Sequence, residues 1–225
     1  MDADFAKMLT PHLYRLVHDV KSPLNAVNGR LFLALRKVTD ETAIRNIVLA
    51  ELGTRNLLRR LYNLYDIAAL ASGRQHLDAS PTDLVSAISE PLAFWRRIGD
   101  VQHVGFNVNI PEGLLINANK TGIERIFDNV VSNVFSHAEE ASVISFMTEA
   151  AGDNIRLTVR NDGVSAEEET INPSEPDMSE GATINALGLV CVQRMMEHWG
   201  GTLEARVSAG GDAFIVVLSF FRSEG

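Results

Sequence analysis

Histidine 18 has the best setting in this sequence for nucleophilic chemistry. It lies in a segment whose apolar residues recur every three or four positions, the spacing of a helix that packs along one side. His18 stands next to this apolar stripe and outside it, so we expect its imidazole ring to be partly exposed and accessible to a reactant. Asp19 follows it directly, and Ser22 lies one helical turn further on. The stripe consists of Leu9, Leu13, Leu16, Val17, Val20, Leu24, Val27, Leu31 and Ala34.

The helix that carries His18 should be long. Thr10 followed by Pro11 fits an N-cap with proline at the first helical position, so we expect the main helix to begin there, with residues 4–9 as a preceding turn or extension. Pro23 lies within the stripe, which continues in register beyond it. We therefore expect Pro23 to kink this helix without ending it.

A second long helix should pair with the first. Thr39 and Asp40 predict a short turn and an N-cap, and the helix should stop near Ser72 and Gly73. Two such helices cannot bury both of their apolar stripes against each other alone, which predicts a homodimer with a four-helix bundle. The alternative is a monomer whose hairpin packs on its own second half. The second stripe consists of Ile44, Ile47, Val48, Leu52, Leu58, Leu61, Leu64 and Ala68.

The second half of the chain has a different pattern, in which short helices alternate with strands. Residues 78–81, Asp-Ala-Ser-Pro, suggest a linker, so we expect a helical hairpin domain over 1–77 and an α/β domain over 78–225. Helices interleaved with antiparallel hairpins favour a two-layer sandwich, with one mixed sheet covered on one face. The expected helices are 83–97, 120–137 and 187–199, and the expected strands are 103–110, 114–117, 142–149, 154–160, 202–208 and 213–220.

The segment around His18 resembles the H-box of sensor histidine kinases, with His18, Asp19, Lys21, Ser22, Pro23 and Leu24 in matching positions. In that family the histidine takes a phosphoryl group and passes it to an aspartate of a response regulator receiver domain. By this resemblance, Asp19 orients His18, and Ser22 occupies the place of a residue that positions water for dephosphorylation of the regulator. The order of elements after residue 78 is similar to the ATP-binding domain that the family shares with certain chaperones, gyrases and mismatch-repair ATPases.

The resemblance also implies a nucleotide site in the second half. Asn129 and Asn133 are four residues apart, so they share one face of a helix, and they match the N-box, in which the second asparagine binds Mg²⁺. Asn161 takes the place of an aspartate that accepts a hydrogen bond from the adenine amino group. Gly163 matches the G1 turn, and Gly188 matches the G2 box, where a glycine between loop and helix can face a phosphate. The implied cofactors are ATP and Mg²⁺ if this site is functional.

Several positions depart from the family pattern around the phosphates. Ser136 stands where a lysine or arginine is common, and Ser165, Ile184 and Ala186 replace glycines. Residues 164–185, the expected lid, contain six carboxylates and no lysine or arginine. Like charges beside a triphosphate weaken its binding. We therefore expect a partly degraded ATP site.

Composition limits which binding partners and which cellular compartment we expect for this protein. The chain has 225 residues, with 20 basic and 29 acidic side chains and a net charge of −9, which argues against a nucleic-acid partner. No window approaches the roughly 18 apolar residues of a membrane span, and the start does not resemble a signal peptide. A single cysteine, Cys191, fits a reducing compartment. We expect a cytoplasmic protein.

Three functions fit these observations. The first is a histidine kinase that phosphorylates His18 from ATP. The second is a histidine phosphotransferase that does not bind ATP and moves phosphate between receivers through His18. The third is a dimeric pseudokinase without enzymatic activity, which docks on an upstream kinase, a sensor protein or a response regulator. Phosphorelay through His18 is common to the first two, so we predict a protein of the two-component His–Asp phosphorelay.

Overall fold

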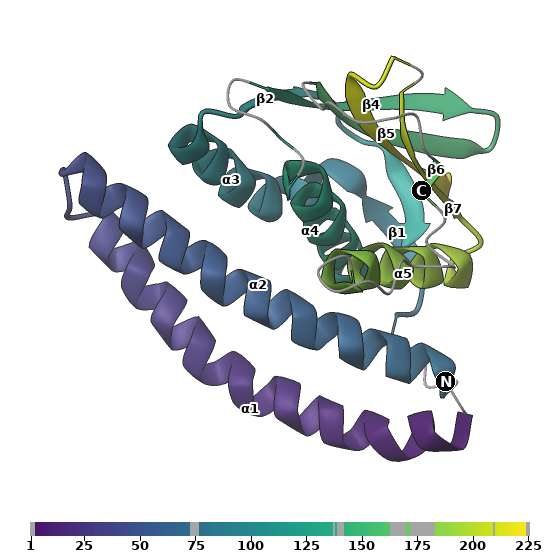
Figure 1. Cartoon of the computed structure of the whole chain (residues 1–225). Coiled ribbons are helices and arrows are strands. Elements are labelled where there is room, and N and C mark those ends of the chain that lie inside the picture. Colours follow the sequence, from purple (N-terminus) through teal and green to yellow (C-terminus); the bar gives the residue numbers. More distant parts are fainter. Residues whose placement is uncertain are drawn as a thin grey trace. The chain divides into compact units, whose positions relative to one another are not determined.

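The computed structural model describes residues 3–72, 77–136, 138, 142–162, 170–171, 183–208 and 210–223. The chain divides into two compact units, Met1–Gln75 and His76–Gly225, which we call the hairpin unit and the α/β unit. Figure 1 shows the elements of both units along the chain. Each unit is described by itself.

The hairpin unit consists of two long helices that pack side by side, α1 (Ala3–Leu35) and α2 (Glu41–Ala71). Asp40 is the N-cap of α2, as the sequence predicts, and its carboxylate accepts a hydrogen bond of 2.8 Å from the Ala43 N–H. Ser72 ends α2, which also agrees with prediction. Val17 of α1 packs with Tyr65 and Ala69 of α2 in the buried centre of the unit. The predicted helical hairpin is confirmed.

The first helix begins earlier than an N-cap at Thr10 would require. Helix α1 already starts at Ala3, so Thr10 and Pro11 lie inside it. The expected N-cap at Thr10 is wrong, and the expectation that residues 4–9 extend the helix is right. Thr10 is buried, and its hydroxyl lies 3.4 Å from the hydroxyl of Ser72, which directly follows α2. Pro11 removes one backbone donor, and the packing of the helix against α2, to which Leu13 contributes, outweighs that loss. Pro23 also lies inside α1.

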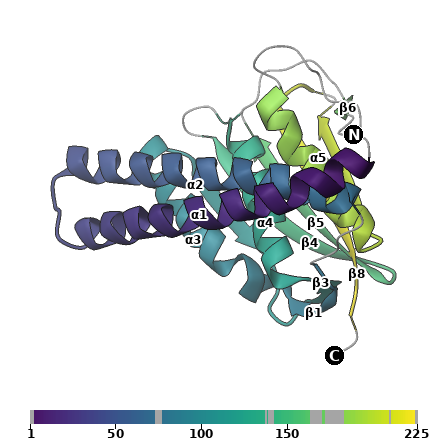
Figure 2. The same ribbon diagram turned by 90° about the horizontal axis from the view of Figure 1, so that it is seen from below.

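The α/β unit is a two-layer sandwich with a mixed six-stranded sheet, as predicted. The strand order is β2-β4-β5-β8-β7-β6, in which the β2–β4 pair is parallel and the other pairs are antiparallel. Figures 1 and 2 show α3, α4 and α5 together on one face of this sheet. The elements are β1 (Ser80–Asp83), α3 (Leu84–Gln102), β2 (Gly105–Asn109), β3 (Leu115–Ala118), α4 (Lys120–Ser136), β4 (Val143–Ala151), β5 (Asn154–Asp162), β6 (Thr170–Ile171), α5 (Thr183–His198), β7 (Thr202–Val207) and β8 (Ala213–Phe221).

The core of this unit lies between the helices and the sheet. Strand β5 alternates buried and half-buried residues, which is the pattern of a strand with one face on the core. Aromatic rings join the two layers, since Phe146 of β4 stacks with Phe127 of α4 at 5.4 Å and with Phe106 of β2 at 5.9 Å. Trp95 of α3 donates a hydrogen bond of 2.9 Å to the Asp128 carboxylate of α4. These contacts hold α4 in a defined orientation on the sheet.

The prediction of a linker over residues 78–81 is wrong for its last two residues. Ser80 and Pro81 belong to β1, which pairs with β3 in a separate antiparallel two-stranded sheet. Proline is tolerated there because this short strand pairs on one side only. Asp83 then caps α3 by accepting a hydrogen bond of 2.7 Å from the Ser86 N–H. Strand β6, of two residues, was also not expected.

The start of the α/β unit is tied into its core. The Trp199 indole N–H, just after α5, donates a buried hydrogen bond of 2.9 Å to the Leu77 carbonyl. The far edge of the same ring lies against Gly122 of α4, where a Cβ atom would come within 2.4 Å of Trp199 Cη2. The chain segment at Leu77 is thereby held against both α4 and α5.

Candidate functional site

His18 projects from the middle of α1 into solvent. Its side chain is 74% exposed and that of Asp19 is 78% exposed, with 3.3 Å between His18 Nδ1 and Asp19 Oδ1. A carboxylate can only accept a hydrogen bond, so this contact assigns the proton of a neutral ring to Nδ1. The Nε2 atom then keeps its lone pair. The arrangement can present a nucleophilic nitrogen to a reactant from outside the helix.

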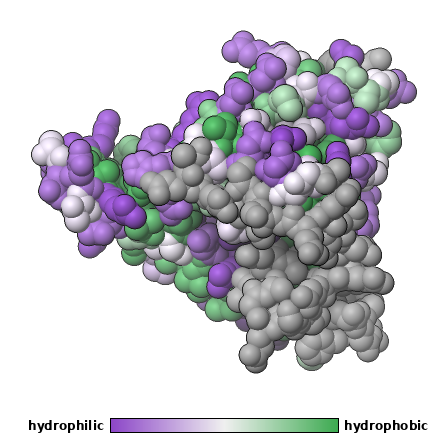
Figure 3. All heavy atoms as spheres, turned by 45° about the horizontal axis from the view of Figure 1, so that its top comes forward, coloured by the Kyte–Doolittle hydropathy of each residue, from purple (hydrophilic) through white to green (hydrophobic). Residues whose placement is uncertain are grey.

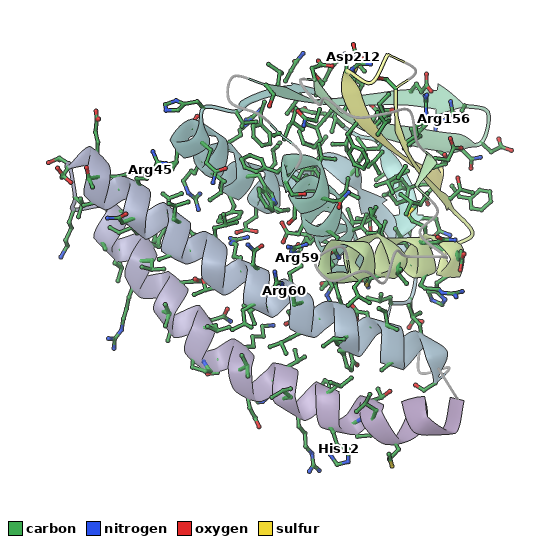
Figure 4. All side chains as sticks on the ribbon, viewed as in Figure 1. His12, Arg45, Arg59, Arg60, Arg156 and Asp212 are labelled. Carbon is green, nitrogen blue, oxygen red and sulfur yellow. The ribbon has the colours of Figure 1, made fainter. Side chains whose placement is uncertain are left out.

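The other H-box residues are exposed on the same helix. Lys21 and Ser22 both face solvent, and Ser22 lies one turn beyond His18. A second exposed histidine, His12, lies nearer the start of α1, and Figure 4 shows it projecting on the side away from α2. No contact of His12 with an acidic side chain corresponds to that of His18 among the hydrogen bonds and ion pairs of the described residues.

Charge is distributed unevenly between the two units. The hairpin unit has 11 basic and 7 acidic residues, a net charge of +4, and the α/β unit has 9 basic and 22 acidic residues, a net charge of −13. The surface that carries His18 is therefore part of a cationic unit. Such a surface attracts an acidic partner during encounter.

The two predicted asparagines of α4 face the interior. Asn129 is 1% exposed and Asn133 is 7% exposed, and both are on one side of the helix. Buried amides are rare unless they bind something or are hydrogen-bonded. Ser136, in the place of the expected cation, donates a hydrogen bond of 2.7 Å to the Asn133 carbonyl. Its hydroxyl thus satisfies one of the last carbonyl groups of α4, which have no partner within the helix.

Asn161 of β5 comes next to the same end of α4. It is fully buried, and its Nδ2 atom lies 3.4 Å from the Val134 carbonyl, which directly follows Asn133 in the chain. Its Oδ1 atom has no hydrogen-bond partner within the described part of the chain. The structure therefore brings Asn133 and Asn161 to one region, where the strand meets the last turn of the helix.

The two predicted glycines have different outcomes. Gly163 lies outside the described residues, as does nearly all of the expected lid over 164–185. Gly188 is buried inside α5, which begins at Thr183, so its expected position between loop and helix is wrong. The residues just before Gly188 include Ala186 and Leu187, which favour helix. They extend α5 toward its N-terminus beyond the predicted start.

The Trp95–Asp128 hydrogen bond was missed at the sequence level, although it lies next to the site. Asp128 directly precedes Asn129, so the bond fixes the rotation of α4 at that turn. No local signal reveals it, because Trp95 belongs to another helix.

Metal ligation in this region would depend on few protein groups. Over the described ranges, no three His, Cys, Asp or Glu side chains come together as ligands. Amide oxygens such as that of Asn133 suit Mg²⁺, which keeps several waters and phosphate oxygens in its shell.

Among the described residues, no helix has the length and apolarity to cross a membrane.

Comparison with known proteins agrees with this geometry. Residues 118–222 match the family described as histidine kinase-, DNA gyrase B-, and HSP90-like ATPase. The chain is 21% identical over 211 residues to the signal transduction histidine-protein kinase BarA of Escherichia coli K12, covering 88% of this chain and 23% of BarA. It is 23% identical over 221 residues to the sensor histidine kinase YcbM of Bacillus subtilis, covering 92% of this chain and 70% of YcbM.

Solved structures show the same fold. The Acinetobacter baumannii histidine kinase AdeS superposes with a TM-score of 0.58 at 15% identity, covering 92% of this chain and 98% of that one. Full-length ShkA, solved in complex with AMPPNP, has a TM-score of 0.60 at 19% identity, covering 96% of this chain and 47% of that one. Both likenesses include the helical hairpin as well as the sandwich. The chain therefore has the fold of a sensor histidine kinase core, in which a hairpin of two long helices precedes a GHKL-type ATPase domain.

Proposed function

We propose that this protein is a two-component phosphorelay protein that is phosphorylated on His18 and passes the phosphoryl group to an aspartate of a response regulator receiver domain. Residues 1–77 would serve dimerisation and phosphotransfer, and residues 78–225 would serve as the ATPase-like domain. The observation that carries this proposal is the exposed His18 with Asp19 at its Nδ1 atom, on the first helix of a histidine kinase fold. Response regulators act in the cytoplasm, where we place this protein.

The chemistry follows from the ring's orientation. His18 Nε2 attacks the phosphorus of a terminal phosphate, a nitrogen–phosphorus bond forms, and the leaving oxygen keeps the electrons of the broken bond. The Nδ1 proton stays on the ring, and the Asp19 carboxylate accepts its hydrogen bond and stabilises the positive charge that develops. In the second step an aspartate oxygen of the receiver attacks the same phosphorus, and His18 Nε2 leaves with its lone pair.

The α/β unit fits a nucleotide. A fully buried Asn161 with an unpartnered Oδ1 atom in the described part of the chain is the kind of group that a bound base would satisfy. We assign Asn129, Asn161 and Gly163 to ATP and Asn133 to Mg²⁺, and we withdraw Gly188 because it lies inside α5. Magnesium supplies neutralisation of the phosphate charge. The net charge of −13 on this unit opposes an anionic ligand, so the affinity should be modest.

We propose that the hairpin unit forms a homodimer. Large apolar side chains lie exposed on both of its helices, and a second copy could bury them in a four-helix bundle. Figure 3 shows apolar residues among polar ones on the hairpin at the left of the view. The exposed apolar residues of the hairpin are Met8, Tyr14, Leu16, Val27, Phe32, Leu33, Leu57 and Leu64.

Partner choice should depend on charge. Arg15 and Lys21 are exposed on α1 on either side of His18 in the sequence. Together with the net charge of +4 on the hairpin unit, they suit the acidic pocket of a receiver domain. We propose an upstream kinase or sensor protein as a further partner.

Labelling with radioactive ATP and Mg²⁺ tests the kinase. Wild-type protein should acquire acid-labile, alkali-stable label, and His18→Gln should acquire none. His12→Gln is the matched control, because His12 is a second exposed histidine of the same helix and should label normally. Chelation of Mg²⁺ should abolish labelling. Labelling of His18→Gln at the wild-type level would refute the role of His18.

A phosphotransferase is the second candidate, and Ser136 favours it. The hydroxyl of Ser136 is used within α4, where a phosphate-binding cation would otherwise stand. For this function, a phosphorylated receiver should label wild-type protein but not His18→Gln, while ATP does not. If neither ATP nor a phosphorylated receiver labels His18, the protein is the docking pseudokinase.

Light scattering tests the dimer. At micromolar concentration we expect twice the mass of one chain. Leu57 and Leu64 lie two turns apart on α2 and are both exposed, so Leu57→Glu combined with Leu64→Glu should shift the protein toward monomer. A monomeric mass for wild type would contradict the four-helix bundle.

A further inference from the structure

We infer that Trp95 positions Asn133 for the proposed Mg²⁺ ion, through contacts on the side of α4 that faces away from Asn133. The inference rests on the proposed nucleotide site. It goes beyond that site by giving a function to a side chain of α3 that belongs to no sequence motif and touches neither the nucleotide nor the metal. Trp95 is in this sense a positioning residue.

The direction of the Asn133 amide depends on the helix that carries it. Asn133 is 7% exposed, and its side chain makes no hydrogen bond within the part of the chain that the structure describes. Its amide is therefore oriented by its rotamer and by the rotation of α4 about the helix axis. A metal ligand has to lie within about 0.5 Å of its productive position. Whatever fixes the rotation of α4 thus decides whether Asn133 can reach the metal.

Trp95 contacts α4 at two points. Its indole N–H donates a hydrogen bond of 2.9 Å to the Asp128 carboxylate, and its ring centroid lies 5.5 Å from that of Phe135. Asp128 and Phe135 are about two helical turns apart, so they lie on the same face of α4. Two contacts along the axis oppose both rotation and tilting of the helix. We call these two contacts the Trp95 clamp.

Asn133 lies between the two contact points along the axis, but on another side of the helix. An α-helix turns by about 100° per residue, so Asn133 is rotated by about 140° from Asp128. The Trp95 clamp therefore leaves the side of α4 with Asn133 free for a ligand. If the clamp is lost and α4 rotates, the amide of Asn133 moves away from the metal position.

The Trp95 clamp is itself well anchored. Trp95 is 3% exposed, and its ring packs edge-on against Phe94 with 5.4 Å between the centroids. Phe135 in turn stacks with Phe106 of β2 at 6.4 Å. The hydrogen bond to Asp128 has a carboxylate as its acceptor, which makes it stronger than a bond between neutral groups. The clamp thus fixes α4 relative to both α3 and the sheet.

Calorimetric titrations of the full chain with ATP, once with Mg²⁺ and once with EDTA, test the inference. Trp95→Phe keeps an aromatic ring and loses the indole N–H. We expect it to lower the affinity measured with Mg²⁺ by about tenfold, as outer-shell partners of metal ligands do, and to leave the affinity in EDTA within about twofold. A purely structural role would lower both affinities equally. That result, or an unchanged affinity with Mg²⁺ in a folded Trp95→Phe, would overturn the inference.

Two further variants control this measurement. Ile98 is fully buried and lies about one turn after Trp95 on α3, so Ile98→Val should lower the melting temperature without changing the ratio of the two affinities. Asn133→Ala should remove the gain in affinity from Mg²⁺, and adding Trp95→Phe to it should change the ratio no further. A further fall in the double variant would overturn the inference, as would a fall in Ile98→Val equal to that in Trp95→Phe.

The wild-type protein offers a test without mutation. Coupling between sites is reciprocal, so Mg²⁺ must stabilise the Trp95 clamp by the factor by which the clamp favours Mg²⁺. Hydrogen exchange of the Trp95 indole N–H, followed by NMR in saturating ATP, should therefore slow by about tenfold when Mg²⁺ replaces EDTA. The Trp199 indole N–H, which donates to the Leu77 carbonyl at 2.9 Å, is the internal control and should slow less. Equal slowing of both would overturn the inference.

Failure of the proposed nucleotide site would look different from failure of this inference. If wild type binds no ATP at millimolar concentration, the site is refuted and the inference with it. If wild type binds ATP equally well in Mg²⁺ and in EDTA, or if Trp95→Phe gains as much from Mg²⁺ as wild type does, ATP binding stands and only the inference is refuted. None of these results depends on labelling of His18.

Discussion

Replacing Gly122 with alanine should destabilise the α/β unit, although the same change in a helix usually does the opposite. Gly122 lies in the first turn of α4, after the N-cap Asn119, whose side chain accepts a hydrogen bond of 3.1 Å from the Gly122 N–H. A new Cβ atom would lie 2.4 Å from Trp199 Cη2 and 2.7 Å from Cζ2. Carbon atoms pack optimally at about 3.5–4.0 Å, so the indole ring would have to move by about 1 Å.

The ring is poorly able to move. Trp199 is buried, and its Nε1 atom donates to the Leu77 carbonyl at 2.9 Å. Overpacking of this kind costs about 2 kcal/mol, and weakening the buried hydrogen bond adds about 1 kcal/mol. The helical preference of alanine over glycine returns at most about 1 kcal/mol. We therefore expect the free energy of unfolding to fall by about 2 kcal/mol.

Tryptophan fluorescence confines the stability measurement to the α/β unit. The protein has two tryptophans, Trp95 and Trp199, and both lie in the α/β unit. Urea unfolding followed by tryptophan fluorescence therefore reports this unit alone. Gly53→Ala in α2 is the matched control, since nothing lies within 4 Å of its added Cβ atom. It should stabilise the hairpin unit by about 0.5–1 kcal/mol, measured by circular dichroism. If Gly122→Ala raises the fluorescence midpoint, the tight contact with Trp199 is wrong.

Three further changes address the hairpin unit and one turn of the sheet. Asp40→Ala should lower hairpin stability by about 1 kcal/mol in thermal melts by circular dichroism, because the cap on α2 is lost, whereas Asp40→Asn should retain most of it. Thr54→Val should cost about 1 kcal/mol in the same assay, because it removes the hydrogen bond that joins Thr54 to Asn28 of α1; no change would show that this bond contributes nothing. A hydrogen bond from Ser208 holds the pKa of Asp212, in the β7–β8 connection (Figure 4), below its ordinary value. Wild type should therefore be more stable than Asp212→Asn at neutral pH, and this difference should vanish as the pH falls through the lowered pKa of Asp212. A difference in stability that persists in acid would argue against this role of Asp212.

The helices and most strands could be predicted because their signals are local. The cap at Asp40 and the stop at Ser72 fix α2, and alternation identifies β5. By contrast, β1 depends on β3, more than 30 residues away, so the pair Ser80 and Pro81 looked like a linker. The early start of α1 was missed for a related reason, since Thr10-Pro11 is a strong local start signal that tertiary packing overrides.

The site was predictable in its residue types and less so in its contacts. Burial of Asn129 and Asn133 follows from their position on a helix with apolar faces, and the exposure of His18 follows from its place beside the stripe. The contact of Asn161 with the Val134 carbonyl could not be foreseen, because it joins a strand to a helix 27 residues earlier. A sequence pattern identifies which side chains can bind, but not which backbone group orients them.

The hydrogen bond between Trp199 and Leu77 also decides where the α/β unit can be cut from the rest of the protein. A fragment that starts after Leu77 would retain an indole N–H in its interior with its acceptor deleted. Recombinant fragments intended for crystallisation or nucleotide titration should therefore retain Leu77 and a few residues before it, so that the amino-terminal charge stays away from the indole.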